Sequence, residues 1–454
     1  MLNWSDLHPG DARPAAAGPA ATALLAAALQ PGDTVLIAGP HAADVITAVA
    51  DRVTSVDLLL RSAPDAEEIA ELLTDAKGEV FCGALDRFAV DETYDVIVAL
   101  DGLERLVGPD TAKFTWTQAL CRLQDHLAPT GRLLLGAENA FGLERLVQPD
   151  ITAALPRDED WGRDVADTAP AGLKPLQASL REAGVEVART YAVFPSLVEA
   201  EVALASVEGF AAVVAARAVA ARNEGPVLMD PYRLVLDAAQ AGLAMELAPA
   251  WYLVGAADTP GSGVLPEDAV PAGTGVLLEE HLLAALRVDD QAILRRIIPE
   301  YVAWLGSGGA GSPDNVILDG SSYRLFGEPQ ELDVVEHLAR FARRVLESGS
   351  RQPWPAAADS HALTARLASM AGITVPEPDF TPEEVVRPRG SAEQLATVAR
   401  LADELAHASA RAILFEGTVS GIRRSLPYRV GHAVLNPARV IRRRARRLLR
   451  KVRR

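Results

Sequence analysis

The stretch Thr34-Val-Leu-Ile-Ala-Gly-Pro-His-Ala-Ala43 decides the fold of this chain. Its first five residues form a short, continuous apolar run, which is typical of a buried strand in a parallel sheet. Gly39 follows directly and permits a sharp turn, after which an apolar helical pattern runs from Ala43 to Val49. We therefore expect a strand, a tight turn and a helix, which is the first unit of a doubly wound sheet.

The same alternation continues along the chain. Further strands are expected at 53–56, 79–82, 94–100 and 132–136, with helices at 65–74 and 114–126. A helix at 177–183 precedes two closing strands, 185–191 and 199–206, which we expect to form an antiparallel pair. Strands and helices that alternate at this spacing predict an α/β fold with a doubly wound, Rossmann-like sheet.

The pattern changes after this sheet, so the first domain is expected to cover residues 1–206. A second, α+β domain of unknown role is expected at 207–385, with helices at 208–222, 276–285, 289–305 and 331–347. A third part, 386–454, begins with a long helical pattern at 391–415. Five apolar residues lie near one face of that pattern: Leu395, Val398, Leu401, Leu405 and Ile413.

Composition excludes several classes of protein. A chain of 454 residues with 49% hydrophobic residues has ample material for folded cores, and its length suggests more than one domain. Its two cysteines, Cys82 and Cys121, give neither a disulfide framework nor a metal-binding spacing, so no metal is predicted. The longest apolar stretch, 210–220, is interrupted by Arg217 and is far shorter than a bilayer span. The N-terminus lacks the basic region of a signal peptide, so a cytoplasmic protein is expected.

Charge is unevenly distributed along the chain. The net charge is −17, yet residues 417–454 hold 13 arginines and lysines and no acidic residue, so the rest of the chain carries −30. An acidic body disfavours nucleic acid, and we predict no nucleic-acid partner. Apolar residues interleave with the basic ones at 439–454, so we expect residues 436–454 to bind an anionic membrane surface, at the inner face of the plasma membrane. Docking to a partner protein, or no specific role, are the alternatives for this tail.

The first domain resembles the class I S-adenosylmethionine-dependent methyltransferase family. The resemblance rests on the glycine turn at Gly39, on Asp57 18 residues later, on the strand that ends before Asp101, and on the turn at 129–131. It covers roughly residues 30–206. The chain departs from the family pattern at the turn itself, where His41 and Ala43 replace the second and third glycines. The resemblance implies S-adenosylmethionine as the cofactor and methyl transfer as the reaction.

The resemblance also implies which residues contact the cofactor. Gly39 would let the backbone approach the methionine part, and Asp57 would accept hydrogen bonds from the ribose hydroxyls. The remaining cofactor contacts would come from Leu58, Leu85, Asp86 and Asp101. Leu85 could equally be an ordinary core residue.

Transfer to a hydroxyl acceptor requires a general base. Glu138, at the end of the fifth strand, and His41, in the first turn, are the candidates. The alternatives are that Glu138 is an acidic residue at a helix N-terminus and that His41 only replaces a glycine.

Two stretches resemble a narrower bacterial subgroup that accompanies glycosyltransferases in cell-surface polysaccharide assembly: Ala137-Glu-Asn-Ala-Phe-Gly-Leu-Glu-Arg-Leu146 and Tyr191-Ala-Val-Phe-Pro-Ser196. This resemblance implies a sugar or glycan hydroxyl, or another small molecule, as the methyl acceptor, and a glycosyltransferase as a partner. The alternative function is a catalytically inactive, methyltransferase-like scaffold that binds a glycosyltransferase or an export complex.

In the second domain, the stretch from Ser312 to Glu328 faintly resembles the metal-binding lobe of aminoglycoside-kinase-like phosphotransferases. The resemblance is incomplete, because the upstream stretch 306–312 is rich in glycine and serine where a catalytic aspartate is needed, and Phe326-Gly327 takes the place of a second aspartate. A strand, an Asp319-Gly320 turn and a second strand explain the same residues as a β-hairpin.

Overall fold

The computed structural model describes residues 5–8, 13–73, 78–90, 92–108, 111, 113–148, 163–223, 225–255, 262–354, 357, 359–376 and 386–424. These fall into two compact units, Met1–Glu393 and Gln394–Arg454. The basic segment 436–454, and with it the predicted membrane contact, lies outside the described residues.

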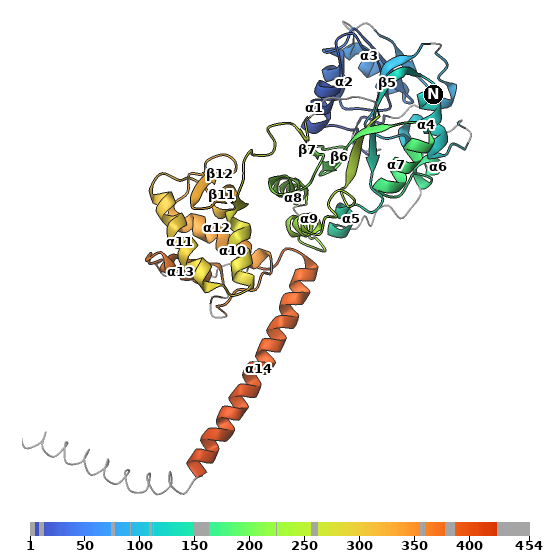
Figure 1. Ribbon diagram of the computed structural model, residues 1–454. Coiled ribbons are helices and arrows are strands. Elements are labelled where there is room, and N and C mark those ends of the chain that lie inside the picture. The colour runs from blue at the N-terminus through green and yellow to red at the C-terminus, as the bar shows by residue number, and fades with distance from the viewer. Residues whose placement is uncertain are drawn as a thin grey trace, which may run out of the picture. The chain divides into compact units, whose positions relative to one another are not determined.

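A nine-stranded sheet forms the centre of the first unit (Figure 1). Its strands are β1 (Thr34–Ala38), β2 (Ser55–Leu60), β3 (Val80–Cys82), β4 (Tyr94–Ala99), β5 (Leu127–Glu138), β6 (Val187–Phe194), β7 (Val202–Leu204), β8 (Ala250–Gly255) and β9 (Val264–Leu265). They lie in the order β3-β2-β1-β4-β5-β8-β6-β7-β9. The five strands from β3 to β5 are parallel, whereas β8 runs antiparallel to both of its neighbours.

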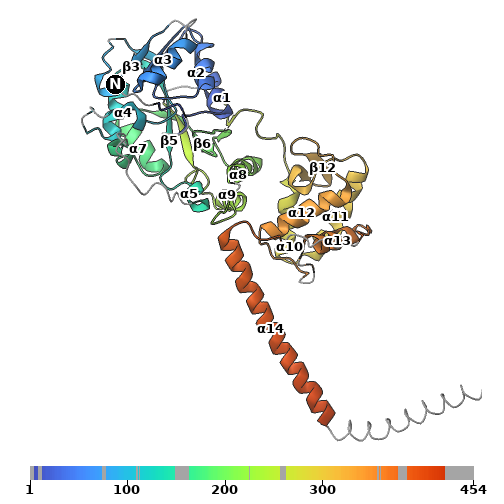
Figure 2. The same ribbon diagram turned by 180° about the vertical axis from the view of Figure 1, so that it is seen from behind.

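Helices cover both faces of this sheet (Figure 1, Figure 2). They are α1 (Pro19–Ala28), α2 (Ala43–Ala50), α3 (Ala63–Leu72), α4 (Trp116–Gln124), α5 (Leu143–Val147), α6 (Arg163–Asp167), α7 (Leu173–Glu182), α8 (Phe210–Arg222) and α9 (Pro231–Gln240). Helices α1 to α3 pack on one face, where Val35 and Ile37 of β1 point. Helices α4 to α9 share a core with Leu36 and Ala38 on the other. The predicted doubly wound α/β sheet is confirmed, since alternate residues of the first strand are buried on opposite faces.

One detail of the predicted strands needs correction. The sequence pattern predicts that the second strand ends at Asp57, but β2 continues to Leu60, so this prediction is wrong. The reason is that Leu58, Leu59 and Leu60 are all buried and divide between the two cores, which extends the strand past the acidic residue. The predicted antiparallel closing pair is confirmed as β6 and β7, and β8 and β9, which lie beyond residue 206, complete the sheet.

The rest of the first unit is mostly helical. Its elements are β10 (Val276–Leu277), α10 (Leu278–Arg287), α11 (Gln291–Gly306), β11 (Val316–Asp319), β12 (Ser322–Leu325), α12 (Val334–Glu347) and α13 (Ser360–Met370). These helices enclose a core of their own around Ile297, Tyr301 and Phe341. β11 and β12 pair antiparallel, with Asp319 opposite Ser322, and Gly320 has a φ of +61°. This confirms the β-hairpin explanation of that stretch.

Helix α14 (Ser391–Arg424) is the longest described helix, with 34 residues. Every residue from Leu401 to Gly421 is exposed. Among the described residues, no helix combines the length and the apolar character needed to cross a membrane.

Candidate functional site

The carboxyl ends of the parallel strands define the candidate site, because open α/β sheets bind ligands at this edge. Gly39 directly follows β1 and has a φ of +86°, in the left-handed region that favours glycine. Its N–H donates to the Leu59 carbonyl oxygen at 2.9 Å. A Cβ atom at this position would lie 3.3 Å from Cδ2 of Leu106. The turn after β1 is therefore tight and requires glycine at this position, as the sequence predicts.

His41 occupies the middle of this edge and is fully buried. Its Nδ1 lies 3.0 Å from the Gly39 carbonyl oxygen, and its Nε2 lies 3.0 Å from the Leu100 N–H, which donates to it. The ring thus ties the ends of β1 and β4 together, and burial lowers its pKa. Because both ring nitrogens are engaged, neither is available to a substrate, and the geometry gives His41 a structural role instead of the predicted role of general base.

Asp57 does not reach the carboxyl edge. It lies in the middle of β2, opposite Leu36 of β1. Its carboxylate accepts hydrogen bonds from the Tyr94 hydroxyl at 2.7 Å and from the Glu79 N–H at 2.8 Å. Burial and this bond to Asp57 raise the pKa of Tyr94. The predicted ribose contact therefore has no support from the geometry of Asp57.

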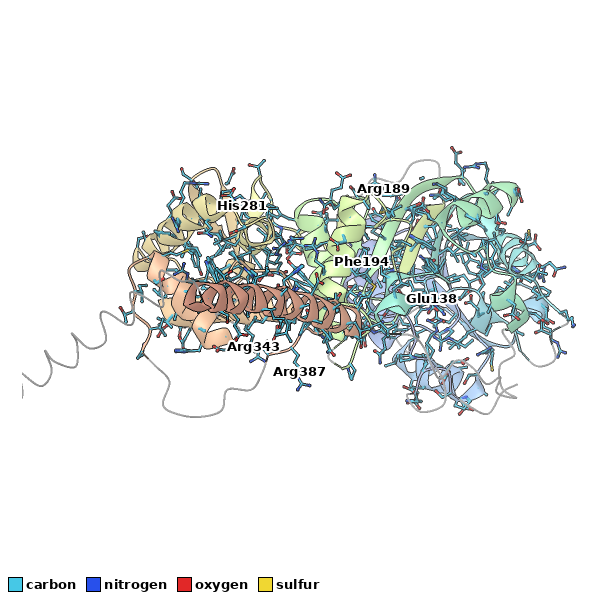
Figure 3. All side chains as sticks on the ribbon, turned by 90° about the horizontal axis from the view of Figure 1, so that it is seen from below. Glu138, Arg189, Phe194, His281, Arg343 and Arg387 are labelled. Atoms are coloured by element: carbon cyan, nitrogen blue, oxygen red, sulfur yellow. The ribbon has the colours of Figure 1, made fainter. Side chains whose placement is uncertain are left out.

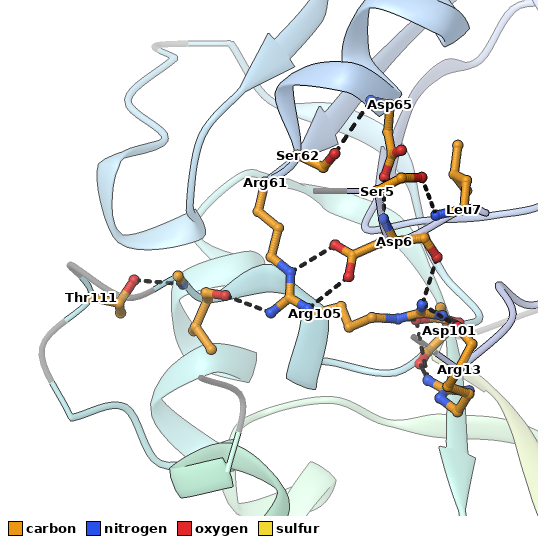
Figure 4. A network of polar contacts seen from close by, with 12 residues as sticks. Ser5, Asp6, Leu7, Arg13, Arg61, Ser62, Asp65, Asp101, Arg105 and Thr111 are labelled. Atoms are coloured by element: carbon orange, nitrogen blue, oxygen red, sulfur yellow. Dashed lines mark hydrogen bonds and ion pairs between the residues drawn. The ribbon is translucent and has the colours of Figure 1, made fainter. Parts of the chain in front are cut away.

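Arg61 stands where an acidic residue was expected, directly after the last residue of β2. Its Nε and Nη2 donate to the two carboxylate oxygens of Asp6, each at 2.8 Å (Figure 4). Its Nη1 donates to the Val107 carbonyl oxygen. The Asp6 N–H donates in turn to the Asp65 carboxylate at the start of α3. A segment from the N-terminus of the chain thus occupies the end of β2.

Asp101, which follows β4, is the centre of a second group of charges (Figure 4). Its carboxylate accepts two hydrogen bonds from Arg105, at 2.6 and 2.7 Å, and one from the Ala16 N–H at 3.0 Å. Arg105 also donates to the carbonyl oxygens of Asp6, Arg13 and Pro14. The predicted cofactor contact Asp101 is therefore at the expected edge, where the N-terminal segment covers it.

The other predicted cofactor contacts are divided between core and edge. Leu58 is fully buried in the core shared with α1 to α3, so it does not line the edge as the resemblance implied. Leu85 is fully buried in the core on the opposite face, as its alternative interpretation allowed. Asp86 lies in the short turn Leu85–Arg87 after β3 and accepts a hydrogen bond from the Thr111 hydroxyl at 2.8 Å.

Glu138 is the last residue of β5, and its side chain is 53% exposed (Figure 3). One of its oxygens lies 3.0 Å from Nη1 of Arg13. Two further acidic side chains follow β4 and β5, and burial is the main reason their pKa values are raised: Glu104 above its usual range, and Glu144 to about 7. A carboxyl group with a pKa near 7, such as that of Glu144, can exchange protons with a ligand near neutral pH.

Comparison with known proteins was made against families, curated proteins and solved structures. No protein-family model and no curated protein matches this chain. The solved structures with a likeness to it include several methyltransferases. N-methyltransferase NodS from Bradyrhizobium japonicum WM9, in complex with S-adenosyl-L-homocysteine, is 15% identical over 24% of this chain, with a TM-score of 0.21. The match spans 54% of the NodS chain, about half its length.

Two longer matches cover about half of this chain. The mycolic acid cyclopropane synthase CmaA1 is 16% identical over 52% of this chain and 86% of its own, with a TM-score of 0.29. A chain in the complex of the Haloferax volcanii Trm112 methyltransferase activator with a methyltransferase is 14% identical over 53% of this chain and 88% of its own, with a TM-score of 0.35. Likenesses this distant carry no argument about function.

Gly39, Asp86, Asp101 and Glu138 therefore each lie at the carboxyl end of a parallel strand, whereas Asp57 and Leu58 lie within β2. Sequence patterns missed the charged residues that close the edge: Asp6, Arg13, Arg61 and Arg105. Arg61 could have been found from the sequence, because it directly follows the apolar run of β2 and so lies at the carboxyl end of that strand. Within the described residues, no group of three or more His, Cys, Asp or Glu side chains could hold a metal ion.

Proposed function

We propose that the sheet domain is an S-adenosylmethionine-dependent methyltransferase domain whose cofactor crevice is covered by its own N-terminal segment. The observation that carries the proposal is the sheet itself. It has the order β3-β2-β1-β4-β5, a glycine turn after β1, and an antiparallel strand inserted next to β5. This arrangement resembles that of class I methyltransferases, and ligands of such sheets lie outside the carboxyl ends of β1 and β4.

The donor groups at this edge suit one end of the cofactor. The methionine part carries an ammonium and a carboxylate. Asp101 and Arg105 offer a buried carboxylate and a buried guanidinium side by side, with complementary charges. Asp86 lies after β3, where the resemblance puts the adenine ring. The ribose end of the cofactor does not fit in the same way. Arg61 lies at the end of β2, where an acidic residue would accept hydrogen bonds from the ribose hydroxyls.

The chain's own residues must position the acceptor and remove its proton. S-adenosylmethionine, when bound, supplies a methyl group on a positively charged sulfur. Glu138 is the candidate base, because it ends β5, is half exposed, and lies 3.0 Å from Nη1 of Arg13. Arg13 also contacts Asp101, so it links the base to the cofactor end of the crevice. We propose a sugar or glycan hydroxyl as acceptor, which rests on the sequence resemblance of residues 137–146.

The N-terminal latch, residues 5–8 and 13–16, is the main obstacle to binding. It supplies Asp6 to Arg61, three carbonyl oxygens to Arg105 and the Ala16 N–H to Asp101. These are the groups that the cofactor would need. Binding must therefore displace the latch, and the affinity falls by the free energy of that displacement.

A second candidate function is favoured by the same Asp6–Arg61 pair. If the latch is permanent, the domain is a catalytically inactive scaffold that binds a glycosyltransferase or an export complex. The peripheral attachment of the basic tail to an anionic membrane belongs to both proposals.

Calorimetric titration of the full chain with S-adenosylmethionine separates the two. The methyltransferase proposal predicts weak binding to the wild type and binding at least tenfold tighter to Asp6→Ala. It also predicts loss of binding in the double variant Asp6→Ala with Asp86→Ala. Absence of binding by both the wild type and Asp6→Ala at millimolar ligand would contradict the methyltransferase and favour the scaffold. Asp237→Ala, which removes a half-exposed carboxylate paired with Arg233 in α9, is the control for removal of a carboxylate elsewhere in the domain.

A further inference from the structure

Helix α14 carries a surface that the proposed function does not use. Its apolar residues recur at alternating intervals of three and four positions, and each of them is exposed. The members of this stripe are Val398, Leu401, Leu405, Ala408, Ala412, Phe415 and Val419. Such spacing keeps side chains on one line along a helix and is the pattern of a coiled-coil seam.

The stripe is a costly surface for an isolated helix. Val398 is 64% exposed, and Leu405 and Phe415 are 68% and 70% exposed. Several large apolar side chains exposed along one line of a helix mark an interaction site. Helices in proteins gain most of their stability from packing against other parts of the structure. All residues of α14 from 401 to 421 are exposed, so this part of the helix gains little from such packing.

We propose that α14 pairs with α14 of a second copy of this chain in a parallel, two-stranded coiled coil. In the heptad notation, Val398, Leu405, Ala412 and Val419 take the a positions. Leu401, Ala408 and Phe415 take the d positions. A valine at a with a leucine at d, as in the first heptad, favours two strands.

Charge complementarity supports a second copy as the partner, and the parallel direction uses charges that are free of other ion pairs within the described helix. Arg411 lies at a g position and Glu416 at the following e position. In a parallel pair, each g residue faces the e residue five positions later on the other helix, so Arg411 faces Glu416 of the second copy, twice by symmetry. The two preceding g–e pairs, Thr397 with Ala402 and Glu404 with Ser409, place no like charges opposite each other. In an antiparallel pair, g faces g and e faces e, so Arg411 would face Glu404, whose carboxylate already accepts a hydrogen bond from Arg400 of its own helix.

Glu404, the other charged residue at a g position, has a partner within its own helix. Arg400 at a c position donates to Glu404 within the same helix at 3.1 Å. This leaves the stripe flanked mainly by small residues, with alanine at 402 and serine at 409. Small residues near the seam let two helices approach closely.

Sedimentation equilibrium of the full chain, at concentrations from about 1 to 100 μM, tests the association. The proposal predicts a dimer for the wild type and a monomer for Leu405→Asp. Leu414→Asp is the matched control, because Leu414 is equally exposed on the same helix but lies off the stripe at a c position. A wild type that is monomeric throughout, a trimer, or a dimer that survives Leu405→Asp would overturn the proposal.

Charge reversal tests the direction. Arg411→Glu and Glu416→Arg should each raise the dimer dissociation constant about tenfold, because each creates two facing pairs of like charge. The double variant should restore the constant to within about threefold of the wild type, because the pairs are attractive again. Single reversals without effect, or a double variant weaker than both, would exclude the parallel register.

Discussion

The Asp6–Arg61 pair offers the sharpest test of the latch. Arg61 makes two charge-assisted hydrogen bonds to Asp6, and the side chains of Arg61 and Asp6 are only 9% and 2% exposed. The pair joins the N-terminal segment to the end of β2, across 55 residues of sequence. If this contact holds the crevice closed, its removal must destabilise the folded chain measurably.

The magnitude follows from burial. Removing one partner of a buried ion pair costs about 3–5 kcal/mol, because the remaining charge stays in a poorly solvated place. We therefore expect Asp6→Ala to lower the free energy of unfolding by about 3 kcal/mol. Arg61→Ala should lower the free energy of unfolding by a similar amount, because it leaves the Asp6 carboxylate without this partner and removes the bond to the Val107 carbonyl oxygen.

Urea denaturation, followed by circular dichroism, gives the free energies for the wild type, both single variants and the double variant. The double variant should lose about 2 kcal/mol less free energy of unfolding than the two single variants lose together. The reason is that each single variant leaves one buried charge without the other, whereas the double variant removes both charges. Single-variant costs that add to within about 0.5 kcal/mol would show that the two residues do not interact, and the latch would be refuted.

Three further predictions concern the sheet domain. Burial raises the pKa of Glu144 to about 7, so the folded state binds this proton more tightly than the unfolded state. The free energy of unfolding should therefore fall as pH rises from about 4.5 toward 7, and the urea midpoints at pH 5 and pH 8 should differ less in Glu144→Gln than in the wild type. An equal difference in both proteins would contradict the raised pKa. His41→Ala should lower the unfolding free energy by about 2–3 kcal/mol, through a cavity and an unpaired Leu100 N–H; an unchanged urea midpoint would contradict the bridging role. Tyr94→Phe should cost about 1–2 kcal/mol by removing the hydrogen bond to Asp57, and a cost no larger than that of a surface substitution would contradict that bond.

How far the sequence predicts this molecule depends on the range of the interactions involved. The β1 strand, its turn and α2 follow from an apolar run, a glycine and a helical pattern within 17 residues, and the structure has all three. The hairpin of β11 and β12 was equally local. In contrast, β8 lies more than 100 residues from its neighbour β5, and no local pattern indicates that it inserts beside that strand.

The site shows the same limit. Gly39 and Asp101 were found because each directly follows a strand with a clear apolar pattern. Asp57 was misplaced because its acidic side chain suggested a strand end, whereas Tyr94, 37 residues away, satisfies its carboxylate inside the sheet. Asp6 and Arg13 reach Arg61 and Asp101 from 55 and 88 positions away, and contacts of that range leave no trace in local spacing.

The central claim is that cofactor and latch compete for one edge of the sheet. Hydrogen–deuterium exchange of the full chain, with and without S-adenosylhomocysteine, measures this competition directly. The Ala16 N–H is bonded to Asp101, and the Ala42 N–H is bonded to the Ala16 carbonyl oxygen. The account predicts that both amides exchange faster when the ligand is bound, while the amides of β1 exchange more slowly. Unchanged or slower exchange at Ala16 and Ala42 under saturating ligand would contradict it.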